Sequence, residues 1–492
     1  MIGIGIGVPF SFSSPIDANA QTIYNRIIAD GGVSNLTRLN FFVKGLKAIY
    51  GDLANVPVCY DAHWIGYKLG SGTGATAGQA AAKLYSLTVA GDAVQSTAAS
   101  QPLLLSHNGA SSDNYWWGSG VQGNFASTPN AAANQITGDI EIISYINLPN
   151  PTSYNNLVTK DDATSNRIFI FSLGSNVLSF ATNFGAGLVT YSSTTSLPSS
   201  VNRWVRVTRN SSNGEVKFFY SADAVTTTPN SVTWIQLGAT VSGTIGASVT
   251  GTSIVAIGAQ AATGLNAVQG RIHRATISNS IGGAPVVDFN PAQYNASTSQ
   301  TAWTSNTGEV WTINTDSAAS GFAGRLVNRT ICAFGGAAQT SSFTANTSIQ
   351  VNQPDTVYSA FKFDVFNAYQ GIFDSNTATT RQQFNNGVNS GGLEMNAGGG
   401  SINTIGLSQN SLKLATVLYN GASSSLQVNN GTAITGSTGT QRMDGLKLGT
   451  LNSNSFTLKG VINTLVVSAA NDNTTTKTAM YNLIRSLNNN SF

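Results

Sequence analysis

The sequence predicts a mainly β protein, in which two antiparallel β-sandwiches in tandem follow a small N-terminal helical region. Short runs of apolar and β-branched residues recur from about residue 100 onward, with turn residues between them at regular intervals. Only 9% of the residues are charged while 41% are hydrophobic, so the chain can form a core beneath a surface of Ser, Thr, Asn and Gly. One order of elements also occurs twice, which indicates two related modules.

Residues 1–100 are predicted to be an N-terminal anchoring region that contains an extended peptide and a helical hairpin. Gly3, Gly5 and Gly7 alternate with isoleucine. This pattern indicates either a flexible peptide or a strand that adds to the sheet of a partner. A dinucleotide-binding loop is excluded, because such a loop needs a strand before the glycines and a helix directly after them.

The helical hairpin is expected over 14–30 and 34–50. The first helix begins at a proline and ends before two glycines, and Ser34 can serve as the N-cap of the second. Apolar residues recur at helical spacing in both segments. A hairpin of this size is too small to be stable alone, so it must dock on another part. Within 55–100 we expect a linker or an irregular loop at 70–82, which is rich in Gly, Ala and Thr.

The first sandwich is assigned to residues 101–290 and the second to residues 291–492. The predicted strands cover 139–148, 167–173, 204–208, 216–220, 253–257, 271–278, 357–364, 413–419 and 458–467. The pair Asn213-Gly214 is the strongest hairpin signal in the chain, because these residues favour the tight turn that joins two paired strands.

The two sandwiches are predicted to arise from an internal duplication. In each half a Gly-rich segment, an alternating strand, a strand–turn–strand unit and a strand after a glycine follow in the same order. Residues 283–325, with Trp303 and Trp311, are expected to bridge the two copies. A helix over 474–487 is expected to close the chain.

Several segments resemble a known group of proteins. They are GIGIGVPF at 3–10, IDANAQ at 16–21, FVKGLKAIY at 42–50, the strands at 203–209 and 216–221, and the closing helix at 471–486. The N-terminal segments look like the start of bacteriophage virion structural proteins. The paired strands are similar to those of laminin-G-like or concanavalin A-like lectin modules, which such virion proteins carry. The chain departs from the commonest pattern of the family between 50 and 85, which leaves open what the N-terminus docks onto.

The resemblance implies a virion structural protein, a capsid- or tail-attached fibre or spike that presents lectin-like sandwiches to the host surface. It implies that the N-terminal region binds other virion proteins and that a host cell-surface carbohydrate is the ligand. A homo-oligomer is expected as well, since multivalency turns weak sugar contacts into useful avidity. The expected location is the outer surface of a particle assembled in the host cytoplasm.

The composition agrees with these expectations. A net charge of +3 without a cluster of Lys and Arg argues against nucleic acid binding. No apolar run approaches the roughly 20 residues that a membrane span requires. The opening residues lack the basic and apolar regions of a signal peptide. We therefore expect neither a nucleic acid partner nor a membrane span.

The alternative is a virion-associated glycan-degrading enzyme of the concanavalin-like kind. Glycoside hydrolases of that kind carry Glu-x-Asp-x-Glu on one strand, and alternation places the three carboxylates on one face. Here Asp139 and Glu141 match the last two positions, but Thr137 occupies the first. A retaining mechanism needs two working carboxylates, and the nucleophile is the one that is missing. We therefore expect no catalytic residues and no enzyme.

The aromatic run Tyr115-Trp116-Trp117 is the candidate carbohydrate-binding site. Exposed rings could stack on a sugar, whereas buried rings would be ordinary core, which is the interpretation we favour.

No metal or cofactor is expected. The adjacent Asp161 and Asp162 are the only pair that could suit calcium, although a loop turn is the simpler interpretation. The three histidines have no ligand spacing. Cys59 and Cys332 are expected to be unpaired thiols in separate domains.

Overall fold

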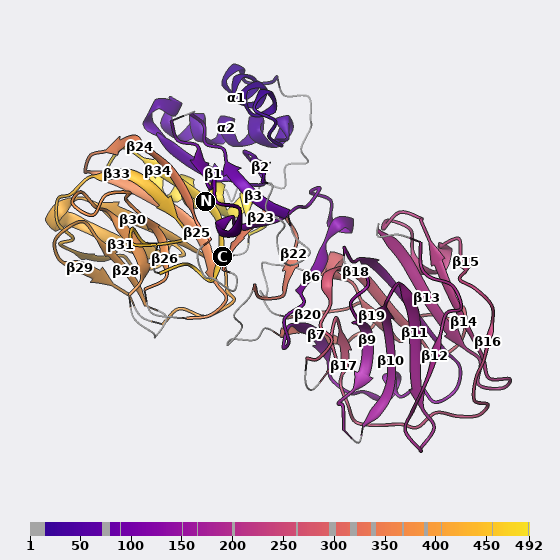
Figure 1. The fold of residues 1–492 in the computed structure, drawn as a ribbon. Helices are drawn as coiled ribbons and strands as arrows, with labels where there is room; N and C mark the ends of the chain where they lie inside the picture. The colour runs from indigo at the N-terminus through magenta and orange to yellow at the C-terminus, as the bar shows by residue number, and fades with distance from the viewer. Residues whose placement is uncertain are drawn as a thin grey trace, which may run out of the picture.

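Two β-sandwiches lie side by side in the computed structural model, and helices lie against the outer side of one of them (Figure 1). The predicted fold class, mainly β with tandem antiparallel sandwiches and a small N-terminal helical region, is confirmed. The structure describes residues 15–70, 79–88, 90–149, 151–164, 166–198, 202–261, 264–294, 302–314, 322–335, 341–366, 369–387, 392–404, 406–454, 456–490 and 492, with the side chains of 346–348 left aside. The predicted extended peptide with Gly3, Gly5 and Gly7 lies outside these residues.

The first sandwich consists of two antiparallel sheets formed by residues 115–327. One sheet has the order β15-β14-β13-β8-β18-β6-β22, with β16 beside β14 and β19 beside β18, and the other has the order β12-β11-β10-β9-β17-β7-β21-β20. The strands are β6 (Tyr115–Ser119), β7 (Phe125–Thr128), β8 (Ile140–Asn147), β9 (Asn155–Asp161), β10 (Arg167–Gly174), β11 (Val177–Asn183), β12 (Leu188–Ser192), β13 (Arg203–Arg209), β14 (Glu215–Ser221), β15 (Ile235–Gln236), β16 (Val241–Ser242), β17 (Val255–Ile257), β18 (Gln269–Ser278), β19 (Val287–Phe289), β20 (Ala302–Thr304), β21 (Val310–Asn314) and β22 (Arg325–Val327).

The second sandwich also has two antiparallel sheets, and strands from two distant parts of the chain form them. One sheet has the order β2-β3-β4-β24-β33-β26-β27-β28-β29. The other has the order β3-β5-β23-β34-β25-β30-β31-β32, and β1 pairs with the second half of β34. Because β3 pairs in both sheets, it joins them along one edge.

The strands of the second sandwich have the following bounds. They are β1 (Val58–Asp61), β2 (Tyr67–Leu69), β3 (Gln79–Leu84), β4 (Ala93–Val94), β5 (Leu103–Leu105), β23 (Ile331–Phe334), β24 (Phe343–Val351), β25 (Asp355–Phe363), β26 (Gly371–Asp374), β27 (Gln383–Asn386), β28 (Leu393–Asn396), β29 (Ser401–Asn403), β30 (Lys413–Tyr419), β31 (Ser424–Val428), β32 (Ile434–Gly436), β33 (Met443–Leu448) and β34 (Gly460–Ser468).

The predicted internal duplication reappears in the order of the strands. The first sandwich contains the run β14-β13-β8-β18-β6. The second contains the run β31-β30-β25-β34-β23, whose members occur in the same order along the chain. The matching segments of the sequence therefore occupy equivalent positions in the two sandwiches.

The strand pairings differ from the predicted boundaries at 100 and 290. Strands β1–β5, predicted to belong to the anchoring region, complete the second sandwich. Strands β20–β22, assigned to the second sandwich or to a bridge, complete the first. Trp303 and Trp311 consequently lie in the core of the first sandwich and not at the junction, and their ring centroids are 6.5 Å apart. The first sandwich is thus an insertion between β5 and β23.

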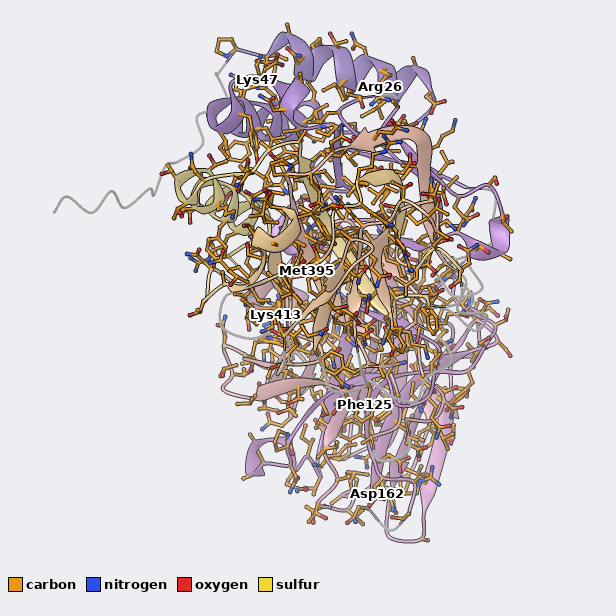
Figure 2. All side chains as sticks on the ribbon, turned by 90° about the vertical axis from the view of Figure 1, so that its left-hand side faces the viewer. Arg26, Lys47, Phe125, Asp162, Met395 and Lys413 are labelled. Atoms are coloured by element: carbon orange, nitrogen blue, oxygen red, sulfur yellow. The ribbon has the colours of Figure 1, made fainter. Side chains whose placement is uncertain are left out.

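The predicted helices form and dock on the second sandwich. They are α1 (Ala18–Ala29), α2 (Leu36–Tyr50) and α3 (Thr474–Leu487), with Asp17, Asn35 and Asn473 as N-caps. The first helix therefore begins three residues after Pro15, and Asn35 replaces the expected N-cap Ser34. Their apolar faces pack on the outer face of the sheet that contains β1, β25, β30 and β34. Figure 2 shows Arg26 and Lys47 of the helices at one end of the molecule and Asp162 of the first sandwich at the other.

Candidate functional site

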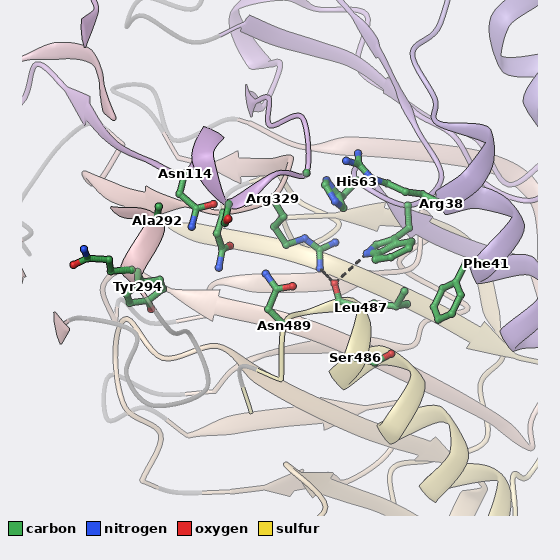
Figure 3. A pocket seen from close by; sticks show the side chains of 15 residues that line it. Arg38, Phe41, His63, Asn114, Ala292, Tyr294, Arg329, Ser486, Leu487 and Asn489 are labelled. Atoms are coloured by element: carbon green, nitrogen blue, oxygen red, sulfur yellow. Dashed lines mark hydrogen bonds between the residues drawn. The ribbon is translucent and has the colours of Figure 1, made fainter. Parts of the chain in front are cut away.

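A pocket of about 640 Å³ opens where the helices, the chain between the sandwiches and the first sandwich meet (Figure 3). We call it the junction pocket. Its lining residues are Arg38, Phe41, His63, Trp64, Gly109, Ser111, Asn114, Ala292, Gln293, Tyr294, Asn328, Arg329, Ser486, Leu487 and Asn489. The volume lies within the roughly 300–1,000 Å³ typical of small-molecule sites. Because six separate stretches of the chain contribute to it, the pocket exists only when both sandwiches are assembled.

The floor of the pocket is held by the buried ion pair of Asp61 and Arg329. Arg329 donates to both carboxylate oxygens of Asp61 at 2.6 Å and to the Leu487 carbonyl at 2.7 Å. Asp61 also accepts from the backbone N–H groups of His63 and Trp64, at 2.9 and 3.0 Å. The pair therefore ties the end of β1, the chain between the sandwiches and the end of α3 to one point.

Aromatic rings form two walls of the pocket. The Trp64 indole N–H donates to the Leu487 carbonyl at 3.0 Å, which fixes the ring, and the Phe41 ring lies 5.5 Å from it. Figure 3 shows Phe41 and Tyr294 at opposite ends, with Arg329 between them. Both Trp64 and Tyr294 are only partly buried, so ring surface faces the pocket.

Two histidines next to the pocket are neutral, and their backbone partners define the tautomers. The Thr330 N–H donates to His63 Nδ1 at 3.0 Å, so the proton of the neutral His63 ring is on Nε2. The Gly109 N–H donates to His107 Nδ1 at 2.9 Å, so His107 Nε2 donates to the Asn114 side-chain oxygen at 3.0 Å. Burial lowers the pKa of His63 to about 2, with the Arg329 and Arg38 charges adding to the effect.

Arg38 places a positive charge at the edge of the pocket. Its guanidinium donates to the Asn108 carbonyl, and no ion pair among the described residues includes it. Burial lowers the pKa of Arg38 and the nearby Arg329 lowers it further, although the group stays charged. Arg329 has its charge balanced by Asp61, whereas the charge of Arg38 is left without a counter-charge in contact.

The predicted carbohydrate-binding run Tyr115-Trp116-Trp117 does not line the pocket, and all three side chains are 0% exposed. Alternation along β6 places Trp116 in the core of the first sandwich. Tyr115 and Trp117 point the other way and pack between the sandwiches against Leu103 and Val461. The candidate carbohydrate-binding site at these rings is therefore wrong, and the favoured interpretation, core packing, is confirmed, because none of the three rings has an accessible face.

The candidate catalytic strand is part of a packed surface. Glu141 is 2% exposed, forms an ion pair with Arg206 and accepts from the Gly282 N–H at 3.0 Å. Asp139 accepts from the Ser211 backbone N–H and hydroxyl at 2.7 and 2.8 Å. Glu141 lies on the same face of β8 as Ile143 and Tyr145. Val232 packs on these two side chains and covers that face. Both carboxylates are engaged with protein groups.

The remaining predicted candidates, Asp161 and Asp162, form contacts with protein groups that stabilise the fold. Asp161 is buried and paired with Arg167 at 3.1 Å, and Asp162 accepts from the backbone N–H of Asn166 at 3.0 Å, as a loop turn requires. No group of three or more His, Cys, Asp and Glu within the described ranges could hold a metal ion. In the same part of the chain, no helix is long and apolar enough to cross a bilayer.

The two cysteines are free and buried, which confirms the prediction of unpaired thiols. Their assignment to separate domains was wrong, because Cys59 on β1 and Cys332 on β23 both flank β34 in one sheet. Cys59 faces the helices while Cys332 faces the core of the second sandwich. Burial raises the pKa of both thiols, so neither is a reactive thiolate at neutral pH.

Comparisons with known proteins give a likeness of fold. No protein-family model matches the chain. No curated protein matches it either. Among solved structures, the LG1-3 region of the laminin alpha2 chain aligns over 73% of this chain and 62% of its own length, less than two thirds, with 8% identity and a TM-score of 0.28. Domains LG4-5 of the mouse laminin alpha1 chain align over 75% and 92%, with 11% identity and a TM-score of 0.27.

A carbohydrate-binding module is also among the similar structures. The CBM40 of the Ruminococcus gnavus IT-sialidase, solved with alpha2,3 sialyllactose, aligns over 33% of this chain and 90% of its own, with 13% identity and a TM-score of 0.24. At these identities the likeness concerns the sandwich architecture and does not extend to ligands or to the source of the chain.

Proposed function

We propose that this chain is a non-enzymatic glycan-recognition protein that bacteriophage particles carry as a capsid- or tail-attached fibre or spike. The observation that supports recognition is the make-up of the junction pocket, in which the rings of Trp64, Phe41 and Tyr294 stand beside arginine and amide groups. A sugar can stack its apolar face on such rings while its hydroxyls bond to the polar neighbours.

The same pocket favours binding over hydrolysis. None of the 15 described residues that line it is Asp or Glu. Glycoside hydrolysis ordinarily needs a pair of carboxyl groups that flank the scissile bond. Glu141, the residue that best matches a hydrolase strand, is bound to Arg206 and lies outside the pocket. These observations support a lectin-like role for the chain.

The virion assignment rests on the N-terminal segments that resemble phage virion proteins and on the weakly charged surface. In this proposal residues 1–14 attach to other virion proteins, while the helical hairpin stiffens the second sandwich. Copies of the chain form a homo-oligomer, so that several pockets engage one host surface and weak contacts add up. The protein is then located on the outer surface of the particle.

Two measurements test the proposal. Mass spectrometry of purified phage particles should detect the chain as a stoichiometric component, and its absence from particles would remove the virion assignment. A fluorescently labelled full-length chain should bind glycans on an array, and the same glycans should show no new reducing ends after incubation. If the wild-type protein releases reducing ends and Glu141→Gln does not, the chain is a glycoside hydrolase and the proposal of a non-enzymatic protein is wrong.

A further inference from the structure

We propose that the junction pocket selects a sugar that carries a carboxylate, and that Arg38 is the residue that recognises it. This inference rests on the proposed function, since it names the ligand class of the same pocket. Three features carry it: the balance of charge in the pocket, the hydrogen-bonding groups that are still available there, and the partial burial of the guanidinium.

The charged groups at the junction pocket leave the positive charge of Arg38 available to a ligand. Arg329 is held in a two-oxygen contact with Asp61, so that pair is close to neutral. Asp113 keeps its charge, but it is not among the groups that shift the pKa of Arg38, and its carboxylate accepts from the Asn108 backbone N–H at 2.8 Å. Within the described part of the chain, the guanidinium of Arg38 donates only to a carbonyl oxygen, and its electrostatic neighbours are the Asp61–Arg329 pair and Tyr67. An anion in the pocket would therefore gain attraction without displacing a protein carboxylate.

The available hydrogen-bonding groups are weighted toward donors. The Leu487 carbonyl already accepts from Trp64 and Arg329, and the Asn114 side chain is bonded through both its oxygen and its nitrogen. The N–H on His63 Nε2 and the remaining N–H groups of Arg38 are donors without a protein acceptor among the described residues. Asn328 and Asn489 also line the pocket, and each amide both donates and accepts, so the excess of donors comes from Arg38 and His63. An ionised carboxylate only accepts, whereas a sugar hydroxyl both donates and accepts, so this set of groups favours the carboxylate.

The partial burial of Arg38 strengthens the contact. Packing against Gly109 removes water from one side of the guanidinium. Charge-assisted hydrogen bonds are stronger in such surroundings than in open water. The planar guanidinium can also hold both oxygens of a carboxylate at once, which a lysine cannot do. The ring of the same sugar would then lie toward Trp64 and Phe41.

The test compares acidic polysaccharide fragments with their carboxyl-reduced forms, which differ only at the carboxylate. The probes are oligosaccharides of hyaluronan and of polygalacturonate, their reduced counterparts, and neutral dextran and laminarin fragments. Binding of each to the full-length chain is measured by isothermal titration calorimetry. At least one acidic probe should bind about tenfold or more tightly than its reduced form. Arg38→Gln should remove that preference, and Arg38→Lys should keep part of it.

Two controls separate the inference from the proposed function. Arg442→Gln removes one positive charge outside the pocket and should leave the preference unchanged. The one ion pair of Arg442 among the described residues is a 3.7 Å contact to Asp444. The melting temperature of each variant shows whether it is folded. Equal binding of acidic and reduced probes, or a preference that survives in folded Arg38→Gln, overturns the inference and leaves glycan recognition standing. No binding of any probe, acidic or neutral, overturns both.

Discussion

Acidification from pH 7 to pH 5 should destabilise the folded chain through histidines that the fold keeps neutral. His273 is the clearest case, because it is 4% exposed and neither ring nitrogen has a hydrogen-bond partner among the described residues. Its ring lies 5.1 Å from the ring of Tyr115 and 5.3 Å from that of Tyr145. Burial lowers the pKa of His273 to about 3, and the charge of Arg271 contributes to the shift.

The sign and size of the effect follow from proton linkage. An unfolded histidine has a pKa of about 6.5, so between about pH 6.5 and pH 3 the unfolded chain binds a proton that the folded chain does not. The free energy of unfolding is therefore highest above pH 6.5 and falls as the pH is lowered. For His273 alone the fall between pH 7 and pH 5 is about 2 kcal/mol, because each pH unit below 6.5 contributes about 1.4 kcal/mol.

The assay is urea unfolding followed by tryptophan fluorescence at pH 7 and at pH 5. His273→Phe keeps a ring of similar size but binds no proton, so the difference between the two pH values should shrink by about 2 kcal/mol. Tyr145→Phe is the matched control, since it alters a neighbouring ring without removing the titrating group. If His273→Phe and the wild type lose the same free energy of unfolding on acidification, His273 does not stay neutral in the folded chain and the reasoning is refuted.

Three further substitutions test the packing between and within the sandwiches. Asp364→Asn leaves the buried Arg325 of β22 without the carboxylate that it contacts at 2.6 Å across the junction, and should lower the free energy of unfolding by about 3–5 kcal/mol in urea titrations. Trp117→Ala empties the cluster between the sandwiches and should cost about 3–5 kcal/mol, with faster limited proteolysis between them; an unchanged proteolysis pattern would contradict that packing. Glu141→Gln weakens the contact to Arg206 and should cost about 2 kcal/mol in stability, whereas glycan binding should stay at the wild-type level.

The local pattern of the sequence predicted the strands well. The expected strands at 139–148 and 271–278 correspond to β8 and β18 within two residues. The Asn213-Gly214 turn joins β13 and β14 as expected, with Gly214 at a φ of 76° that favours glycine. Alternation and turn chemistry are properties of neighbouring residues, so a single sequence is enough to detect them.

The pairing of distant strands could not be predicted in the same way. Nothing in the residues of β1 to β5 indicates that they complete a sheet with strands more than 200 positions later, such as β23 against β5. The junction pocket depends on that pairing, because it brings His63 and Trp64 next to Arg329 and Leu487. The sequence around His63-Trp64 predicted no site, because its partners in the pocket are set by tertiary contacts alone.

The most direct test of glycan recognition at the junction pocket is a crystal structure of the full-length chain with the oligosaccharide that binds it most tightly. The account predicts sugar density in the junction pocket, with a ring against Trp64 and a carboxylate oxygen within hydrogen-bonding distance of Arg38. Density at another place, such as the 250 Å³ pocket beside Tyr154 at one end of the first sandwich, with the junction pocket left free of sugar, would contradict it.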